Sequence, residues 1–255
     1  MEKLTVVKVG GKVVEEERPL TRLLADFAVM EGYRILVHGG GRLATQLASA
    51  LGIESRMVEG RRITDAETLK VVTMVYAGWV NKTIVARLQA LDINAIGLTG
   101  VDMNVIRSEK RPVETIDYGF VGDVKEVNAD ALTWLLQRGM VPVLSPLTHD
   151  KQGHLLNTNA DTIAGETAKA LAAKFDVTLM YCFEKGGVLM NETDERSVIA
   201  EMDRRLFRQY REQGIITGGM IPKLENAFQA IDAGVSQVMI TSASDIRKNS
   251  GTHIR

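Results

Sequence analysis

The sequence predicts an α/β fold, a three-layer αβα sandwich around an open, mainly parallel central sheet. Short β-branched runs alternate with amphipathic helical runs along most of the 255 residues, a pattern typical of parallel strands connected by helices. The predicted strands are apolar almost throughout, as expected when both faces of a sheet are covered. Hydrophobic residues make up 45% and charged residues 25% of the chain, which indicates a folded globular core rather than a disordered or membrane-embedded chain.

The elements follow in order along the chain. The predicted strands of the sheet are six short apolar runs, at residues 5–9, 35–37, 95–98, 141–144, 177–182 and 237–241. Two helices are predicted by apolar residues at helical spacing, the first by Leu20, Leu23, Leu24 and Phe27 and the second by Leu43, Leu47, Ala50 and Leu51. The polar stretch 119–128 and the turn 149–153 are expected to leave the sheet as excursions or hairpins.

One long helix is predicted over residues 65–91. It opens at Thr64-Asp65-Ala66-Glu67, which has the form of a capping box. The apolar residues that follow spread over more than one helical face, which is typical of a helix covered on two sides. A central position in the core and a subunit interface explain this pattern equally well.

The charge balance indicates no general attraction to nucleic acid or to acidic membranes. Lys and Arg total 31 and Asp and Glu total 32, for a net charge of −1, so any anion has to be bound by local groups. No apolar run approaches the roughly 18 residues of a membrane span. The four histidines are too scattered to suggest a zinc site. We therefore expect neither a nucleic-acid nor a membrane partner.

The single cysteine, Cys182, cannot form an intrachain disulfide, which favours a reducing, cytoplasmic location. Because Cys182 lies in the apolar run 177–183, a small core thiol is favoured over a nucleophile.

Four glycine-bearing segments indicate an anionic ligand. Each follows a predicted strand or opens a predicted helix, at residues 8–11, 38–41, 184–187 and 217–220. Glycine at such places lets main-chain N–H groups approach an anion, and a helix N-terminus adds partial positive charge. One such turn would mean little, because many are only tight connections. Four in one chain favour a phosphate or carboxylate ligand.

The second of these segments also matches a dinucleotide fingerprint. Gly39-x-Gly41-x-x-Ala44 has the required glycine spacing, and Glu59 lies where an acid would hold the ribose. The fingerprint normally follows the first strand of its unit, whereas Lys8-Val9-Gly10-Gly11 precedes it here. A dehydrogenase is therefore the disfavoured interpretation.

Two lysines beside glycine turns indicate phosphoryl transfer. Lys8 ends the first strand, and Lys223 follows Gly218-Gly219-Met220-Ile221-Pro222 at a helix start. Because parallel strands end along a common edge, residues from opposite ends of the sequence can meet there. Phosphoryl transfer spreads negative charge over oxygens, and the protein contributes mainly positioning and cations. Taken singly, each lysine could equally be a surface residue.

Two further charged residues extend this pattern. Asp161, at the start of the helical run 163–172, could orient both lysines or act only as a helix cap or first-turn acid. Arg62 is placed to hold a carboxylate bidentately, although a lone loop arginine is usually solvated.

Together these motifs resemble the N-acetylglutamate kinase branch of the amino acid kinase family, over almost the whole chain. The motifs that carry the resemblance are Lys8-Val9-Gly10-Gly11, Val37-His38-Gly39-Gly40-Gly41, Gly60-Arg61-Arg62-Ile63-Thr64, Val80-Asn81-Lys82, Asn157-Thr158-Asn159-Ala160-Asp161 and Ile216-Thr217-Gly218-Gly219-Met220-Ile221-Pro222-Lys223. The first two are shared across the family, and the Arg62, Asn157 and Lys223 segments are specific to the acylglutamate branch.

The resemblance implies an enzyme that phosphorylates the side-chain carboxylate of N-acetyl-L-glutamate in arginine biosynthesis. ATP would be the co-substrate, with Mg²⁺ carried by ATP rather than by protein side chains. Lys8 and Lys223 would stabilise the transferring phosphoryl group, and Asp161 would hold both lysines. Residues 1–172 would form a lobe for acylglutamate binding and dimerisation, and residues 173–255 an ATP-binding lobe.

The resemblance also assigns two sets of binding residues. The acylglutamate would contact Gly40, Gly41, Arg62, Asn157 and Asn159. The nucleotide would contact Gly10, Gly11, Glu184, Lys185, Gly186, Gly187, Ile216, Thr217, Gly218 and Gly219.

The chain departs from the family pattern in three places. Glu184 stands where an Asp is usual near the ribose, and the region between Thr241 and Gly251 is shorter than usual. The chain starts at its first strand, without the extra helix of arginine-inhibited hexamers. We therefore expect a cytoplasmic homodimer that is insensitive to arginine and forms through the 65–91 helix.

Three alternatives remain open from the sequence. The acyl group could be larger than acetyl, such as succinyl. The substrate could be that of another kinase of the family. The chain could also be a non-catalytic amino-acid or nucleotide sensor on the same fold.

Overall fold

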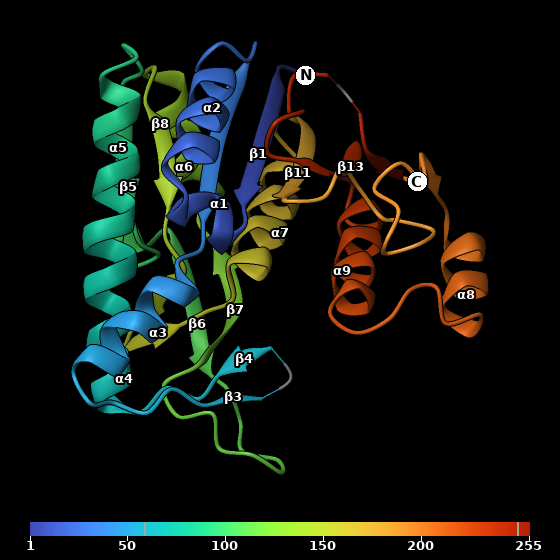
Figure 1. Ribbon diagram of the computed structural model, residues 1–255. Helices are drawn as coiled ribbons and strands as arrows, with labels where there is room; N and C mark the ends of the chain where they lie inside the picture. The colour runs from blue at the N-terminus through green and yellow to red at the C-terminus, as the bar shows by residue number, and fades with distance from the viewer. Residues whose placement is uncertain (59, 249) are drawn as a thin grey trace.

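The computed structural model describes residues 1–58, 60–248 and 250–255; Glu59, the ribose-binding candidate of the dinucleotide interpretation, lies outside them. The main sheet has the strand order β12-β14-β13-β11-β1-β2-β8-β5 (Figure 1). In that order the strands span Glu201–Met202, Thr252–Ile254, Gln237–Ser242, Asp176–Phe183, Lys3–Val9, Tyr33–His38, Val141–Leu144 and Ala95–Leu98. Neighbouring strands from β13 to β5 run parallel. The six predicted strand runs are confirmed in this one sheet.

The C-terminal edge of the sheet is mixed. β14 pairs antiparallel with β13, and the short β12 pairs parallel with β14.

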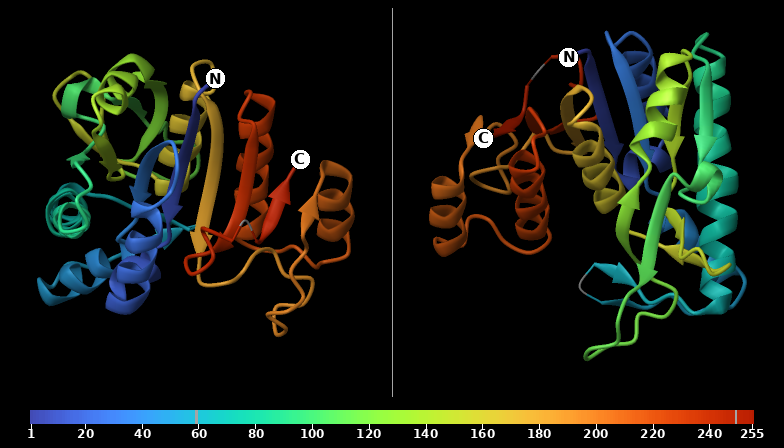
Figure 2. Two further views of the ribbon diagram at one scale, coloured as in Figure 1. Left: turned by 90° about the horizontal axis from the view of Figure 1, so that it is seen from above. Right: turned by 180° about the vertical axis from the view of Figure 1, so that it is seen from behind.

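Helices cover both faces of the main sheet (Figure 2). One face is covered by α1 (Gly11–Glu15), α2 (Glu17–Ala28), α3 (Gly41–Ala50), α4 (Ala66–Thr73), η1 (Met74–Val80) and α5 (Asn81–Gln89). The other face is covered by α6 (Ala129–Gln137), α7 (Ala160–Leu171), α8 (Arg204–Glu212) and α9 (Met220–Asp232). Adjacent β1 residues show the two layers directly, because Val6 packs with the second helix set and Val7 with the first. The predicted three-layer αβα sandwich is confirmed.

A smaller sheet lies beyond the carboxyl ends of the main strands (Figure 1). Its order is β10-β9-β6-β7, and these strands span Leu155–Asn157, Leu147–His149, Ile106–Lys110 and Gly122–Val127. β9 and β10 form an antiparallel hairpin across the predicted turn 149–153, and β7 of the polar stretch 119–128 pairs antiparallel with β6. A short 3₁₀ helix, η2 (Asp102–Asn104), precedes β6.

A two-stranded hairpin, β3 (Met57–Val58) and β4 (Arg61–Arg62), adjoins the smaller sheet. Two backbone hydrogen bonds tie the segment after β4 to the loop between β6 and β7. Thr64 N donates to Tyr118 O over 2.9 Å, and Phe120 N donates to Thr64 O over 2.7 Å. The hairpin is thereby held against the smaller sheet.

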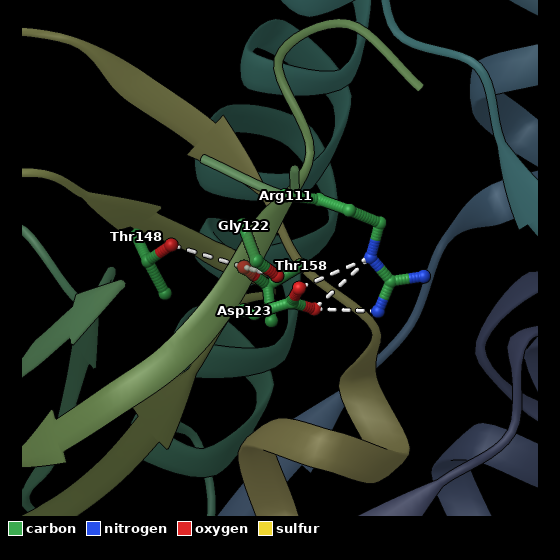
Figure 3. A network of polar contacts seen from close by, with 5 residues as sticks. All are labelled: Arg111, Gly122, Asp123, Thr148 and Thr158. Carbon is green, nitrogen blue, oxygen red and sulfur yellow. Dashed lines mark hydrogen bonds and ion pairs between the residues drawn. The ribbon is translucent and has the colours of Figure 1, made fainter. Parts of the chain in front are cut away.

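Polar contacts fix the strand β7 in the smaller sheet (Figure 3). The Arg111 guanidinium pairs with the Asp123 carboxylate, and its Nε lies 3.1 Å from both carboxylate oxygens. On the other side, the buried Thr148 and Thr158 hydroxyls lie 2.9 Å apart, and Thr158 Oγ1 donates to Gly122 O over 3.4 Å. These contacts hold the end of β10, which carries Asn157, and the residues that follow it, which include Asn159.

The predicted long helix is present as the continuous run α4, η1 and α5, but its cap differs from the prediction. The N-cap is Asp65, whose Oδ1 accepts from Thr68 N over 2.7 Å. Thr64, predicted as the first residue of a capping box, is buried and donates to Arg62 O instead. The middle of the run is a π-helix, which shifts the register of the helix faces.

Of the two interpretations of this helix, the central position in the core is wrong, and the subunit interface stays a prediction. Val72, Val80 and Ile84 are buried against the sheet, whereas Met74 is 52% and Trp79 is 69% exposed. One face of the helix therefore belongs to the core, and the opposite face presents large apolar side chains.

Candidate active site

Two glycine turns lie side by side at the carboxyl edge of the main sheet. Gly10 and Gly11 follow β1 and open α1, and Gly40 and Gly41 follow β2 and open α3. A Cβ built on Gly11 would lie 3.9 Å from the Gly41 nitrogen and 4.0 Å from the Gly40 nitrogen. Because both turns precede helices, they bring main-chain N–H groups into one place, which suits an anion.

The backbone conformation and the neighbours of Gly40 leave no space for a side chain. Its φ is 156°, a conformation that side-chain-bearing residues rarely adopt. A Cβ there would lie 3.0 Å from Cδ1 and 3.2 Å from Cε1 of Tyr76. The Tyr76 ring, from the π-helical segment, therefore packs directly on the backbone of this turn.

The structure brings Lys8, Asp161 and Lys223 together from β1, α7 and α9. Lys8 Nζ lies 2.7 Å from Asp161 Oδ1, and Lys223 Nζ lies 3.5 Å from Asp161 Oδ2. The Phe183 ring lies beside both lysines, with its centroid 3.5 Å from Lys223 Nζ and 5.3 Å from Lys8 Nζ. Two cations thus share one carboxylate and one aromatic face.

Burial and charge act in opposite directions on this cluster. Burial opposes ionisation of Asp161, but the charges of Lys8 and then Lys223 outweigh it and hold the Asp161 pKa below its usual range. For Lys223, burial lowers the pKa and the Asp161 charge opposes that shift. Asp161 is therefore ionised at neutral pH, and it stabilises the charged form of Lys223.

The Arg62 side chain points from β4 to the start of α3. Its Nη1 donates to Ser55 Oγ over 2.8 Å, and its Nη2 donates to Gly41 O over 2.8 Å and to Thr45 Oγ1 over 2.9 Å. Arg62 is only 7% exposed, so these contacts fix the guanidinium beside the Gly40–Gly41 turn. A buried, oriented guanidinium suits a carboxylate ligand.

Asn157 and Asn159 flank the same space and have different partners. Asn157 Nδ2 donates to Thr64 Oγ1 over 3.0 Å, which leaves its Oδ1 as an acceptor. Asn159 is the N-cap of α7, and its Oδ1 accepts from Asp161 N over 2.7 Å and from Thr162 N over 3.3 Å. The capping role belongs to Asn159, and the Asp161 side chain is left to contact the lysines.

These groups surround a cavity of about 190 Å³. Its lining includes the acylglutamate candidates Gly40, Gly41, Arg62, Asn157 and Asn159, together with Lys8 and Asp161. Sequence reasoning did not name several further lining residues for the site: Gly39, Met57, Gly60, Arg61, Tyr76, Val121, Pro146, Thr158 and Ala160. Among the residues that the structure describes, the lining holds three cationic side chains and one acidic side chain, which favours a small anionic ligand.

The segments predicted for the nucleotide lie in different places. Lys185, Gly187, Ile216 and Thr217 line a small cavity of about 50 Å³ with Val188, Leu189, Glu192, Ile215 and Met220. Gly218 has a φ of 53°, Gly219 is the N-cap of α9, and Gly186 lies between Lys185 and Gly187. Glu184 lines another cavity of about 400 Å³, between the α1–α2 region and the end of β13, which Lys12, Arg18 and Arg22 also line.

The remaining candidate groups are accounted for within the described ranges. No group of three His, Cys, Asp or Glu side chains there could hold a metal ion, and no helix there has the length and apolar character needed to cross a membrane. Cys182 is fully buried, and burial raises the pKa of its thiol to about 12, in agreement with a core thiol.

The chain belongs to the amino acid kinase family, whose model matches residues 3–242. It is 72% identical over 254 residues to the acetylglutamate kinase of Parabacteroides distasonis, covering 100% of both chains. It is 69% identical to the acetylglutamate kinase of Phocaeicola vulgatus, covering 100% of this chain and 99% of the relative. Among solved structures, it resembles smu.665 from Streptococcus mutans UA159, with a TM-score of 0.80, 28% identity and 98% of each chain covered.

Proposed function

We propose that the chain catalyses ATP-dependent phosphorylation of the side-chain carboxylate of N-acetyl-L-glutamate, a step of arginine biosynthesis. The observation that carries this proposal is one carboxylate, Asp161, shared by Lys8 and Lys223 beside a cationic cavity. Relatives that match the whole chain at 72% and 69% identity are named acetylglutamate kinases, which supports this substrate. The enzyme is a phosphotransferase with a carboxyl group as acceptor.

The proposed reaction needs no general base from the protein. A side-chain carboxylate oxygen attacks the γ-phosphorus of ATP, a new P–O bond forms, and the bond from that phosphorus to the β,γ-bridging oxygen breaks. The products are an acyl phosphate and ADP. A carboxylate is already ionised at neutral pH, so no general base is needed. The protein therefore acts by positioning and by stabilising negative charge.

Each predicted catalytic and substrate-binding residue has a role in this step. Lys8 and Lys223 stabilise the transferring phosphoryl group, and Asp161 holds both ammonium groups. Lys8 lines the cavity, and Lys223 pairs with the other carboxylate oxygen of Asp161. Arg62 binds a carboxylate of the substrate, and Asn157 Oδ1 accepts from the acyl amide N–H. The main-chain N–H groups of Gly40 and Gly41 point to the reacting carboxylate. The Asn159 side chain forms part of the lining of the substrate cavity.

The nucleotide belongs to the second half of the chain in this proposal. Residues 173–255 form the ATP-binding lobe, with Glu184, Lys185, Gly186, Gly187, Ile216, Thr217, Gly218 and Gly219 around the nucleotide. Gly10 and Gly11 approach its phosphates from the first half, where residues 1–172 bind the acylglutamate. MgATP is the co-substrate, with Mg²⁺ bound to its phosphates. Glu184 lines a different cavity from the one that Lys185, Gly187, Ile216 and Thr217 line.

The active form is a cytoplasmic homodimer. The helical run over residues 65–91 forms the interface, because it presents Met74 and Trp79 to solvent in the single chain. Large exposed apolar side chains on one helix face are typical of a protein contact.

A coupled assay of ADP release tests the proposed reaction. Purified protein with MgATP is expected to turn over N-acetyl-L-glutamate, and free glutamate, aspartate, carbamate and uridine monophosphate are expected to be poor substrates. N-succinyl-L-glutamate is measured beside the acetyl compound, and the larger kcat/KM identifies the acyl group. Absence of turnover with every N-acylglutamate, from folded protein, would contradict the proposal. Tight binding by calorimetry without turnover would instead indicate a sensor.

A further inference from the structure

A buried polar network lies directly behind the Gly39–Gly41 turn. His38, at the end of β2, is fully buried; its Nδ1 lies 2.8 Å from Gly39 O, and its Nε2 lies 3.1 Å from Asn81 Nδ2. Asn81 Nδ2 also donates to Val143 O over 2.9 Å. The network therefore connects the glycine turn to α5 and β8, and none of the roles proposed above uses it.

The partners of this network define one tautomer of His38. The Lys82 ammonium, which can only donate, lies 3.2 Å from Asn81 Oδ1, so the Asn81 amide nitrogen is the group that faces the imidazole. Asn81 then donates to His38 Nε2, which must be the unprotonated nitrogen. Nδ1 carries the proton and donates to Gly39 O, which can only accept.

Through the peptide between Gly39 and Gly40, the His38 contact determines where the Gly40 N–H points. In a trans peptide the C=O and the N–H point in opposite directions, so holding Gly39 O toward His38 aims the Gly40 N–H away from it. The Gly40 nitrogen is next to Gly11, and Gly40 lines the cavity that contains Lys8. Within the described residues, the Gly40 N–H donates to no other group of the chain.

Residues of β5 and of the long helix pack closely around the network. A Cβ on Gly97 would lie 1.9 Å from Asn81 Oδ1, so the glycine in β5 is what admits Asn81 and Lys82. Lys82 Nζ donates to Gly97 O over 2.9 Å. The π-helical segment just before Asn81 places Tyr76 and Val80 on Gly40. The continuous run of η1 and α5 therefore contacts the turn directly through Tyr76 and Val80 and indirectly through Asn81 and His38.

We propose that His38 is a positioning residue for phosphoryl transfer: its Nδ1–H holds the Gly39–Gly40 peptide so that the Gly40 N–H stays directed at the reacting carboxylate, and Asn81 with Lys82 fixes the tautomer that makes this possible. The inference rests on the proposed reaction. It assigns His38 no contact with substrate, so its effect is on the donor geometry that the transition state requires.

Two substitutions of His38 separate the hydrogen bond from the volume of the ring. His38→Leu fills the space but has no donor, and kcat is expected to fall about 100-fold, the order seen when one preorganised donor is lost. The KM values for ATP and for N-acetyl-L-glutamate are expected to change much less. His38→Asn keeps an N–H where Nδ1 stood and is expected to recover at least about a tenth of the wild-type kcat.

A direct readout of the tautomer completes the test. Long-range ¹H–¹⁵N NMR of the wild type is expected to show His38 protonated at Nδ1, and Asn81→Leu is expected to shift it toward the Nε2–H form with a parallel loss of kcat. Leu136→Ala in α6 is the matched control. It creates a core cavity of about 2–5 kcal/mol cost away from the turn, so its melting temperature should fall while kcat at 25 °C stays unchanged.

Three results would overturn the proposal. The first is a folded His38→Leu protein whose kcat is within about twofold of wild type. The second is a loss of kcat that His38→Asn does not recover at all. The third is an Nε2–H tautomer in the wild type. Failure of the proposed reaction itself would look different, because the wild-type protein would then show no turnover while its tautomer could still be measured.

Discussion

Replacing Asp161 by Asn is the most informative perturbation of the site, because it keeps the shape of the side chain and removes one buried charge. The carboxylate lies 2.7 Å from Lys8 Nζ and 3.5 Å from Lys223 Nζ. At an effective dielectric of about 20, these contacts correspond to about 6 and about 5 kcal/mol of Coulomb energy. Most of that energy offsets the desolvation of three charged groups.

The net cost follows from what Asp161→Asn leaves behind. Two largely buried lysines would lack their counter-ion, and breaking a buried pair in this way costs about 3–5 kcal/mol. Lys223 can relieve part of the cost by losing its proton, because burial already lowers its pKa. We therefore expect the free energy of unfolding to fall by about 3 kcal/mol and kcat to fall by at least about 100-fold.

Urea denaturation at pH 7 and the coupled ADP assay measure the two effects. Asp130→Asn is the matched control, because it removes an acid that pairs with Lys174 at the surface, where Asp130 is 87% exposed, and exposed pairs contribute little. In the double variant with Lys223→Met, the destabilisation should be less than the sum of the two single effects. An Asp161→Asn protein as stable and as active as the wild type would refute this reasoning.

Three further predictions concern other parts of the chain. Burial lowers the pKa of His38 to about 4. Between about pH 6.5 and 4 the unfolded state therefore binds more protons than the folded state, and the free energy of unfolding falls as the pH is lowered, by at most about 3 kcal/mol. Urea denaturation at pH 4.5 and at pH 7 should show a smaller loss of stability at the lower pH for His38→Leu than for the wild type. Gly40→Ala should lower stability by about 1–3 kcal/mol and reduce kcat, because its Cβ meets the Tyr76 ring; an unchanged melt would contradict the contact. Trp79→Glu should give a folded monomer by sedimentation velocity, and a persistent dimer would exclude that helix face as the interface.

The position of Lys8 could be predicted from the sequence, because Lys8 lies near the end of β1 and parallel strands that alternate with helices all end at one edge of the sheet. Asp161 and Lys223 lie near the starts of α7 and α9, which follow β10 of the smaller sheet and a loop after α8. Their meeting with Lys8 depends on how those two helices pack, which the strand rule does not give. The glycine turns mark the same edge, because tight strand-to-helix turns need them.

The sequence gives less information about the long helix. Its apolar residues spread around the helix, but the exposed side of Met74 and Trp79 and the contact of Tyr76 with Gly40 depend on the π-helical register. The wider turn of a π-helix cannot be recognised from the spacing of apolar residues in the sequence. The cap at Asp65 instead of Thr64 also depends on tertiary contacts. The Thr64 hydroxyl donates to Arg62 O and accepts from Asn157 Nδ2, so it does not cap the helix.

The His38 network could not be predicted either. It needs the pairing of Val37 with Leu144 and of Gly97 with Val143, which bring β2, β8 and β5 into register beside Asn81. Buried polar contacts of this kind depend on three-dimensional neighbours and on tautomers, and no local sequence pattern reports them.

The most direct test of the account is the steady-state kinetics of Lys8→Met beside the wild type, with MgATP and N-acetyl-L-glutamate each varied. If Lys8 stabilises charge on the transferring phosphoryl group, kcat falls by at least about 100-fold and both KM values stay within about threefold of wild type. An unchanged kcat, or a loss confined to KM, would contradict the proposed role of the lysine pair.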